Sequence, residues 1–550
     1  MRSARRIAAI CGALAMAAGL MVTLATSASA ADSTTYLGGV IGKGDVAVGG
    51  GKVFVSASDR IVVADTNGAL TGAVTGLSNA QDLVVTPDGA RLYAALSGSD
   101  EVAEIDTATL AVTRRFDVAA HRCPQHLSLS GARLWVGYGC NTPGAWENGA
   151  YSLDLSATAP QPAAPVKHGV GAAPLVAAAG DTLVVGTTGT TSSDLLMFDV
   201  GGDNPTPRGT LDGFTSGLAF LEELAITPDG STVITVARAE SRLEAWDTTS
   251  LTAVRAYTDA QGDAVAVALS PDGARLAGGW ASSASKPRVT VHDAATAQQT
   301  NAYEDTTREP VYASVAFSGS DLFAVQRERK TGRLYLWRVH GAALPASAVR
   351  LTPPAEAKAL EPLTITGQLT TNGLSAPGAQ PLVVTRQPPR GAIVTLPTAT
   401  TKADGTFTIT DTPPIGGWTT YQVLWDGDAG FRWSSASVRV FVSRREWTLT
   451  LTGPDVGTVG QPLQFSGTLS NVDPVSPAGV PLSVRRAVFT PDGSYYTELP
   501  KLTTGADGSF SFSDTPVESG PQTYIVTKAE DNVYLPAQAS HDVNVQAATQ

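Results

Sequence analysis

Residues 86–112 read TPDGARLYAALSGSDEVAEIDTATLAV, and residues 227–254 repeat the outline as TPDGSTVITVARAESRLEAWDTTSLTAV. In each TPDG, the Pro presets a negative φ and the Gly accepts a positive one, which predicts a tight turn. An apolar strand follows the turn, and after a loop comes another strand that ends in Asp. The two stretches therefore indicate a repeated β unit.

The unit recurs along the first 345 residues with a period of 39 to 50 residues. Its second strand begins at seven places: Lys52, Arg91, Arg133, Thr182, Thr232, Arg275 and Asp321. This period is typical of a four-stranded propeller blade, so we count seven blades, with six or eight as alternatives. The last unit has no evident fourth strand, and we expect the strand near Thr34 to complete it and close the ring.

Six of the units end their third strand in Asp: Asp65, Asp106, Asp154, Asp199, Asp247 and Asp293. Arg338 takes this place in the seventh unit. Because nearly every unit carries the same short side chain, we interpret it as a cap for the turn into the fourth strand rather than as a charged site.

The stretches TPDGARLYAAL…EVAEIDTATLAV and TPDGSTVITVA…RLEAWDTTSLTAV resemble YVTN-type and WD-repeat-like β-propeller units over residues 45–340. Four units lack the PDG turn and the last lacks the final Asp, so the match departs from the family pattern there. The resemblance implies a β-propeller over residues 31–345.

A second repeat, with a period near 100 residues, fills the remainder of the chain. LTITGQL at Leu363 matches LQFSGTL at Leu463, and KADGTFTITDTP at Lys402 matches GADGSFSFSDTP at Gly505. Alternating strands with Gly, Pro and Asp turns predict two β-sandwiches. The blocks resemble bacterial immunoglobulin-like repeats over residues 349–443 and 446–547, and the short linker SRREW at Ser443 predicts a stiff rod.

Composition agrees with an all-β, multidomain protein: a seven-bladed β-propeller plus two tandem immunoglobulin-like β-sandwiches. The 550 residues exclude one compact domain, and 55 Gly and 34 Pro with only 16% charged residues indicate many turns. A formal net charge of −12 excludes an electrostatic footprint for nucleic acid.

The N-terminus predicts export. Arg2, Arg5 and Arg6 precede the apolar run 7–25, and Ala28-Ser29-Ala30 offers a cleavage site, so residues 1–30 are interpreted as a signal peptide. An uncleaved membrane anchor is the alternative, and a twin-arginine signal is a variant. No later apolar run reaches about 18 residues. We therefore expect a secreted, extracellular monomer without a membrane span after signal removal.

Cys123 and Cys140 flank a predicted hairpin. A two-residue loop at Gly131-Ala132 places them directly opposite each other, in a non-hydrogen-bonded pair where Cα atoms approach most closely. This predicts a cross-strand disulfide, with a metal site or two free thiols as alternatives.

Candidate ligand-binding residues precede the first strands of several units. Asp45, Asp82, His126 and Glu223 occupy this register, with Ala266 and Ser314 in the sixth and seventh units. The residues nearby in sequence are Arg122, Glu222, Asp263, Arg308 and Tyr312. In a closed propeller these residues converge at the mouth of the channel. The set is that of a divalent cation site with oxygen ligands, or of a base working near neutral pH; alternatively, it is an ordinary wet channel entrance.

No HExxH, GxSxG or Walker motif occurs in the chain. We therefore predict a non-catalytic binding or adhesion protein, with a propeller head on an immunoglobulin-like stalk and an extracellular protein or cell-surface glycan as partner. The alternative is a lactonase- or lyase-like propeller enzyme with a metal at the channel mouth. We expect no cofactor in the first case and a divalent cation in the second.

Overall fold

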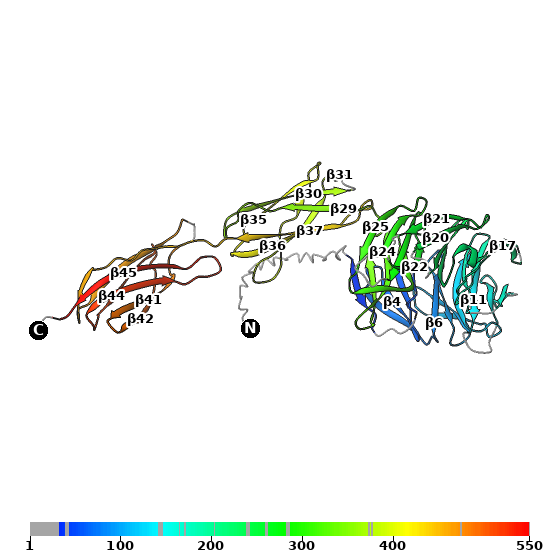
Figure 1. Cartoon of the computed structure of the whole chain (residues 1–550), viewed down its shortest axis with the longest axis horizontal. Coiled ribbons are helices and arrows are strands. Elements are labelled where there is room, and N and C mark those ends of the chain that lie inside the picture. Colours follow the sequence, from blue (N-terminus) through cyan, green and yellow to red (C-terminus); the bar gives the residue numbers. More distant parts are fainter. Residues whose placement is uncertain are drawn as a thin grey trace, which may run out of the picture.

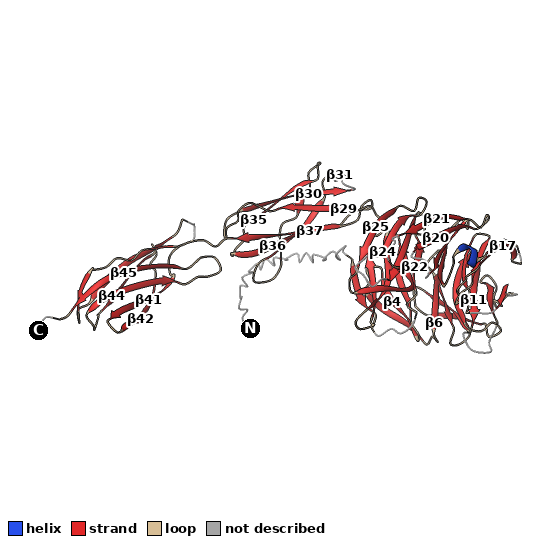
Figure 2. Ribbon diagram, viewed as in Figure 1, coloured by secondary structure: helices blue, strands red, loops and turns tan. Residues whose placement is uncertain are grey.

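The structure is a computed structural model. It describes residues 32–548 except 39–42, 141–146, 164–165, 170–171, 203, 238–241, 259–261, 282–286, 372–373, 376–377 and 473–475. The predicted signal peptide lies outside the described residues. The described part is built of strands with a single short helix, α1 (Gly213–Ser216) (Figure 2). The strands form a large body followed by two smaller ones in a row (Figure 1).

Residues 33–339 form seven four-stranded sheets in the described part of the chain. The first three are β2–β5 (Val46–Gly49, Lys52–Ser56, Arg60–Asp65, Leu70–Thr75), β6–β9 (Ala80–Val85, Arg91–Leu96, Glu101–Asp106, Val112–Asp117) and β10–β13 (Pro124–Ser130, Arg133–Gly139, Asn148–Asp154, Val166–Gly169). The next three are β14–β17 (Leu175–Ala179, Thr182–Gly186, Leu195–Asp199, Thr206–Leu211), β18–β21 (Leu221–Ile226, Thr232–Ala237, Arg242–Asp247, Ala253–Thr258) and β22–β25 (Asp263–Leu269, Arg275–Ala281, Pro287–Asp293, Gln299–Glu304).

The last sheet closes the ring with a strand from the other end of the region. It contains β26 (Arg308–Ser318), β27 (Asp321–Glu328), β28 (Leu334–Val339) and, as its outer strand, β1 (Ser33–Tyr36). Thr34 pairs with Trp337, so the N-terminal strand completes this sheet as predicted. The first strands of neighbouring sheets contact one another in a full cycle, from β2 through β26 and back to β2. The arrangement is a β-propeller.

The apolar second strands form the core between sheets. All seven begin at the residues predicted from the sequence, and their side chains are almost entirely buried. Each buried cluster combines neighbouring sheets; Val53 and Val55 of the first sheet, for example, pack with Phe323 and Val325 of the last. Hydrophobic burial thus holds the sheets to one another as well as each sheet to itself.

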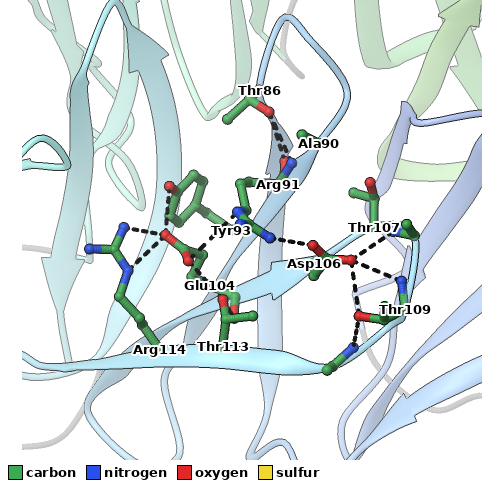
Figure 3. A network of polar contacts seen from close by, with 12 residues as sticks. Thr86, Ala90, Arg91, Tyr93, Glu104, Asp106, Thr107, Thr109, Thr113 and Arg114 are labelled. Atoms are coloured by element: carbon green, nitrogen blue, oxygen red, sulfur yellow. Dashed lines mark hydrogen bonds and ion pairs between the residues drawn. The ribbon is translucent and has the colours of Figure 1, made fainter.

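The six Asp residues at the ends of the third strands cap turns, which confirms their predicted role. Asp106 Oδ1 accepts hydrogen bonds from the backbone N–H groups of Ala108 and Thr109, while its other oxygen pairs with Arg91 (Figure 3). The carboxylates of Asp65, Asp154, Asp199, Asp247 and Asp293 accept equivalent backbone bonds. In the seventh sheet Arg338 pairs with Phe323 across the ladder and forms an ion pair with Asp321, so it does not replace the Asp in this role.

The disulfide between Cys123 and Cys140 is confirmed, with Cα atoms 5.3 Å apart. The predicted register needs a correction. Ser130 pairs with Arg133 as expected, but a bulge between Pro124 and His126 shifts the ladder, and Pro124 pairs with Tyr138. The cysteines therefore lie just beyond the regular ladder, with Cys123 at φ 58°, and not in a directly opposed pair.

Residues 347–442 form the first sandwich, two sheets around one core. One sheet has β29 (Ser347–Thr352), β30 (Leu363–Thr371), β31 (Leu374–Ser375) and β35 (Thr406–Asp411); the other has β32 (Pro381–Gln387), β33 (Val394–Thr395), β34 (Ala399–Thr400), β36 (Gly417–Trp425) and β37 (Ser434–Val442).

Residues 448–546 form the second sandwich on the same plan. Its sheets are β38 (Thr448–Leu449), β40 (Leu463–Ser470) and β43 (Ser509–Asp514), and β39 (Val456–Thr458), β45 (Ala537–Gln546), β44 (Gly520–Lys528), β41 (Pro481–Thr490) and β42 (Gly493–Thr503).

One arginine anchors each junction between these bodies. Arg432 of the first sandwich binds the Asp32 carboxylate at 2.6 and 2.8 Å, donates to the His340 carbonyl and lies 4.7 Å from the Tyr303 ring centre. Arg445 in the linker donates its guanidinium to the Ala359 carbonyl of the first sandwich at 2.7 Å and its backbone N–H to the Val533 carbonyl of the second at 2.7 Å. These bonds are consistent with a stiff connection, because each linker is held by the folded units on both sides.

Candidate functional site

The entrance carboxylates bind the backbone of the next sheet in the ring. The Leu83 N–H donates to Asp45 Oδ2 at 2.7 Å, and the Leu127 N–H donates to Asp82 Oδ2 at 2.9 Å. The Val267 N–H donates in the same way to Glu223 Oε2 at 2.7 Å. The three contacts are equivalent. Each acceptor has an equivalent position in the next sheet, and the residue directly after that position donates the N–H. The same contact thus occurs at three places around the ring.

The first strand of each sheet explains why such acceptors are needed. It has a ladder partner on one side only, so some of its N–H groups face the neighbouring sheet. Register shifts immediately precede His126, Glu223 and Ala266 and further disturb the ladder there. A carboxylate from the preceding sheet accepts a hydrogen bond from an N–H group that has no partner in the ladder, and this bond links the two sheets.

Lys43 and the three carboxylates form one electrostatic cluster. Burial, then the charge of neighbouring Asp82, raises the pKa of Asp45 well above its usual range. Burial also raises the pKa of Asp82, against the opposing effect of Lys43. The pKa of Glu223 is raised to about 8, again chiefly by burial. Glu223 is therefore largely protonated at neutral pH, and its Oε2 already accepts the Val267 N–H.

His126 belongs to the same cluster. Its side chain is 12% exposed, and burial followed by the charge of Lys43 holds its pKa well below the usual range. The imidazole is therefore neutral at neutral pH. Its Nδ1 lies 3.8 Å from Asp82 Oδ2, which is beyond hydrogen-bonding distance, so the pair does not form a base held in place by a carboxylate.

A cavity of about 260 Å³ opens beside this cluster. The polar residues that line it are Lys43, Gln81, Gln125, His126, Thr188, Glu222 and Tyr312. Amide, hydroxyl and charged groups thus face one small volume, a lining suited to hydrogen bonding with a polar ligand.

The structure brings together four of the predicted site residues, Asp45, Asp82, His126 and Glu223, but not the two arginines. Arg122 pairs with Asp100, and its side chain is 69% exposed. Arg308 pairs with Asp305 and lies 4.4 Å from the Tyr335 ring centre. Neither arginine lines the cavity.

The arrangement also bears on the cation hypothesis. Within the described ranges, no group of three or more His, Cys, Asp and Glu side chains is arranged to hold a metal ion. Asp45, Asp82 and Glu223 instead direct oxygens at backbone N–H groups. The cluster thus acts chemically as a set of hydrogen-bond acceptors around one ammonium group.

Sequence reasoning missed Lys43. It stands two residues before Asp45, outside the register in which candidate residues were sought, and its charge acts on all four members of the cluster. One signal in the sequence could have indicated Lys43. Buried carboxylates need a nearby positive charge, and Lys43 is a cation close in sequence to the first of them.

No protein-family model and no curated protein matches this chain. Among solved structures, it is similar to the β-propeller domain of Cps50 (Swd1) from Myceliophteria thermophila, with 15% identity, coverage of 56% of this chain and 99% of that one, and a TM-score of 0.41. It is also similar to hydrazine synthase from Kuenenia stuttgartiensis, with 16% identity, coverage of 54% and 96%, and a TM-score of 0.40. For Hsv2 from Kluyveromyces lactis the identity is 10%, the coverage 53% and 96%, and the TM-score 0.39.

By its sheet topology the chain is a propeller protein, and likenesses of this size carry no argument about its function. In the part of the chain that the structure describes, no helix has the length and hydropathy needed to cross a membrane.

Proposed function

We propose that this protein is a secreted, non-catalytic binding protein whose seven-bladed propeller head carries a ligand site at the channel entrance. The single observation behind this is that Asp45, Asp82 and Glu223 accept backbone N–H groups of the neighbouring sheets. Residues used to hold the ring together are not poised for proton transfer. The ligand would contact the remaining cavity groups, of which Gln81, Gln125 and Tyr312 carry neutral hydrogen-bonding atoms.

The rest of the chain would serve as a stalk of two immunoglobulin-like domains, with the propeller over residues 31–345 and the domains over 349–443 and 446–547. The two-sheet plan of each sandwich and the arginine anchors at both junctions support this division. The disulfide supports export, because such bonds persist in oxidising compartments. The partner would be an extracellular protein or a cell-surface glycan, bound by a monomer.

The test is a binding screen of the chain without residues 1–30 against glycan arrays and extracellular proteins, repeated with two variants. Tyr312→Ala removes a cavity side chain and should weaken binding about tenfold or more. Phe214→Ala, at a side chain 85% exposed on α1 that does not line the cavity, is the matched control and should bind normally.

The competing enzyme hypothesis makes a different prediction. If Mg²⁺, Ca²⁺, Mn²⁺ or Zn²⁺ raises the Tm of the propeller and His126→Ala abolishes that rise, the entrance holds a metal and the binding proposal fails. Equal loss of binding in Tyr312→Ala and Phe214→Ala would also contradict a site at the cavity.

A further inference from the structure

The first sandwich carries an exposed aromatic pair on the solvent face of its larger sheet. Trp418 on β36 pairs with Phe441 on β37, and their side chains are 53% and 56% exposed. The rings meet edge to face with centres 5.3 Å apart, and the Arg439 guanidinium lies 4.8 Å from the Trp418 ring centre. Large aromatic side chains left in water beside an arginine are typical of binding surfaces.

The duplicated second sandwich shows that the fold does not need these residues. Its strands β44 and β45 pair in the same register, with Pro521 opposite Asn544 and Thr523 opposite Asp542. These positions correspond to the pairs Trp418–Phe441 and Thr420–Arg439 of the first sandwich. The aromatic pair is therefore a property of one copy, and stability of the common fold does not account for it.

The remainder of the same face is uncharged, with six polar and two apolar side chains. Solvent-facing positions on β32, β36 and β37 are occupied by Val383, Thr385, Gln387, Thr420, Gln422, Leu424, Ser435 and Ser437, and among the face positions described Arg439 carries the only charge. Hydroxyl and amide groups hydrogen-bond to other hydroxyl groups without any requirement for charge.

A cavity of about 620 Å³ is lined by Phe441 of the first sandwich and Leu535 of the second. Its lining also includes four charged residues, Glu356, Lys358, Arg444 and Glu446. Two acidic and two basic side chains leave this cavity without a net charge, so it offers no attraction to a strongly charged polymer.

We propose that Trp418, Phe441 and Arg439 form a binding platform for a neutral polysaccharide chain. The apolar C–H face of a sugar ring would pack on the exposed Trp418 ring, and the Thr, Gln and Ser side chains of the face would bond to its hydroxyl groups. A charged glycan or a charged peptide would find few complementary charges on this face. The platform is separate from the propeller entrance and does not depend on the function proposed for it.

The experiment measures binding of the chain without residues 1–30 to cellulose, xylan, mannan and dextran, with polygalacturonate as the charged comparison. We expect binding to at least one neutral polysaccharide, loss of about tenfold or more in affinity for Trp418→Ala, and retention in Trp418→Tyr. Tyr496→Ala is the matched control, because Tyr496 is 57% exposed on the second sandwich with Arg485 4.7 Å from its ring centre. It should bind normally.

Three results would overturn the proposal: no binding to any neutral polysaccharide, binding to polygalacturonate alone, or equal weakening in Trp418→Ala and Tyr496→Ala. A protein partner that is lost in Trp418→Ala while the four neutral polysaccharides fail to bind would also overturn it. Tyr312→Ala, in the propeller cavity, should leave polysaccharide binding on the platform unchanged, so the two sites are tested independently.

Discussion

Asp82 in the propeller and Asp411 in the first sandwich are both shielded carboxylates, yet their partners differ. Asp411 accepts two bonds from Arg386 Nη1 at 2.7 and 2.8 Å and one from the Tyr421 hydroxyl at 2.6 Å. Asp82 accepts backbone N–H groups and shares Lys43 with Asp45 and Glu223. The first sandwich therefore pairs this acid with its own cation, whereas the entrance of the propeller places three acids around one lysine.

The second sandwich repeats the first arrangement. Asp514 accepts from Arg486 and, at 2.8 Å, from the Tyr524 hydroxyl. The Arg–Asp–Tyr triad was thus kept in both copies while the exposed aromatic pair was not. Both sandwiches thus pair a shielded carboxylate with its own cation, whereas the three carboxylates around Lys43 have raised pKa values.

Breaking a triad should have the largest effect. Asp411→Ala and Asp514→Ala each leave a shielded arginine without its partner, and each should lower the free energy of unfolding of its own sandwich by about 3–5 kcal/mol. Urea unfolding followed by hydrogen exchange in β36 and β44 measures this for each sandwich. Tyr421→Phe, which removes one hydrogen bond, should cost only about 1 kcal/mol. Equal losses for Asp411→Ala and Tyr421→Phe would mean that the Arg386–Asp411 ion pair contributes no more to the free energy of unfolding than a single hydrogen bond.

The propeller should lose stability as pH rises. Glu223 has a pKa of about 8 in the folded chain against 4.5 ordinarily, so the folded state holds a proton that the unfolded state releases. Its contribution is complete below pH 4.5 and is lost as pH rises through 8. The contribution of Glu223 to the free energy of unfolding should then fall by up to about 1.4 kcal/mol per pH unit between these limits.

Thermal and urea unfolding of the propeller across pH 6.5 to 8 would reveal this slope, and Glu223→Gln should make it shallower. Below pH 6.5 the lowered pKa of His126 acts in the opposite direction. The two sandwiches, each with an Arg–Asp–Tyr triad, serve as the comparison: their unfolding is measured over the same pH range in the same chain. A variant with an unchanged slope would show that Glu223 is not the group responsible.

Removing one bond between neighbouring sheets should have a moderate effect. Asp82→Ala leaves the Leu127 N–H without its acceptor and should destabilise the propeller by about 1–3 kcal/mol. Asp82→Asn keeps an oxygen at this place and should cost less. The ratio of the two losses, measured by urea unfolding, separates hydrogen bonding from charge, and an Asn variant as unstable as the Ala variant would argue against the backbone bond.

The smallest effect is expected at an exposed turn. Asp247 accepts from the N–H groups of Thr249 and Ser250, and these bonds lower its pKa. Asp247→Ala should cost about 0.5–1.5 kcal/mol. Because the folded pKa is lowered, this contribution is lost as pH falls, opposite to that of Glu223. Thermal unfolding at pH 3 and pH 7 should show a smaller difference between variant and parent at pH 3.

Much of the fold was predictable from local patterns. The seven second strands, the turn-capping Asp residues and the closing strand near Thr34 follow from a repeat whose period and turn chemistry are written in the chain. The disulfide was also predictable, although the bulge before His126 was not, because nothing in PQHLSLS marks the point where one strand gains a residue over its partner.

The candidate site was predictable only as a position. The register of Asp45, Asp82, His126 and Glu223 located the channel entrance, but their hydrogen bonds join residues 38 to 45 positions apart, on different sheets. The sequence by itself determined which elements form and in what order, because strands and turns depend on neighbouring residues. Only the tertiary structure decided that these carboxylates serve the backbone around Lys43, because burial and charge depend on residues brought together by ring closure.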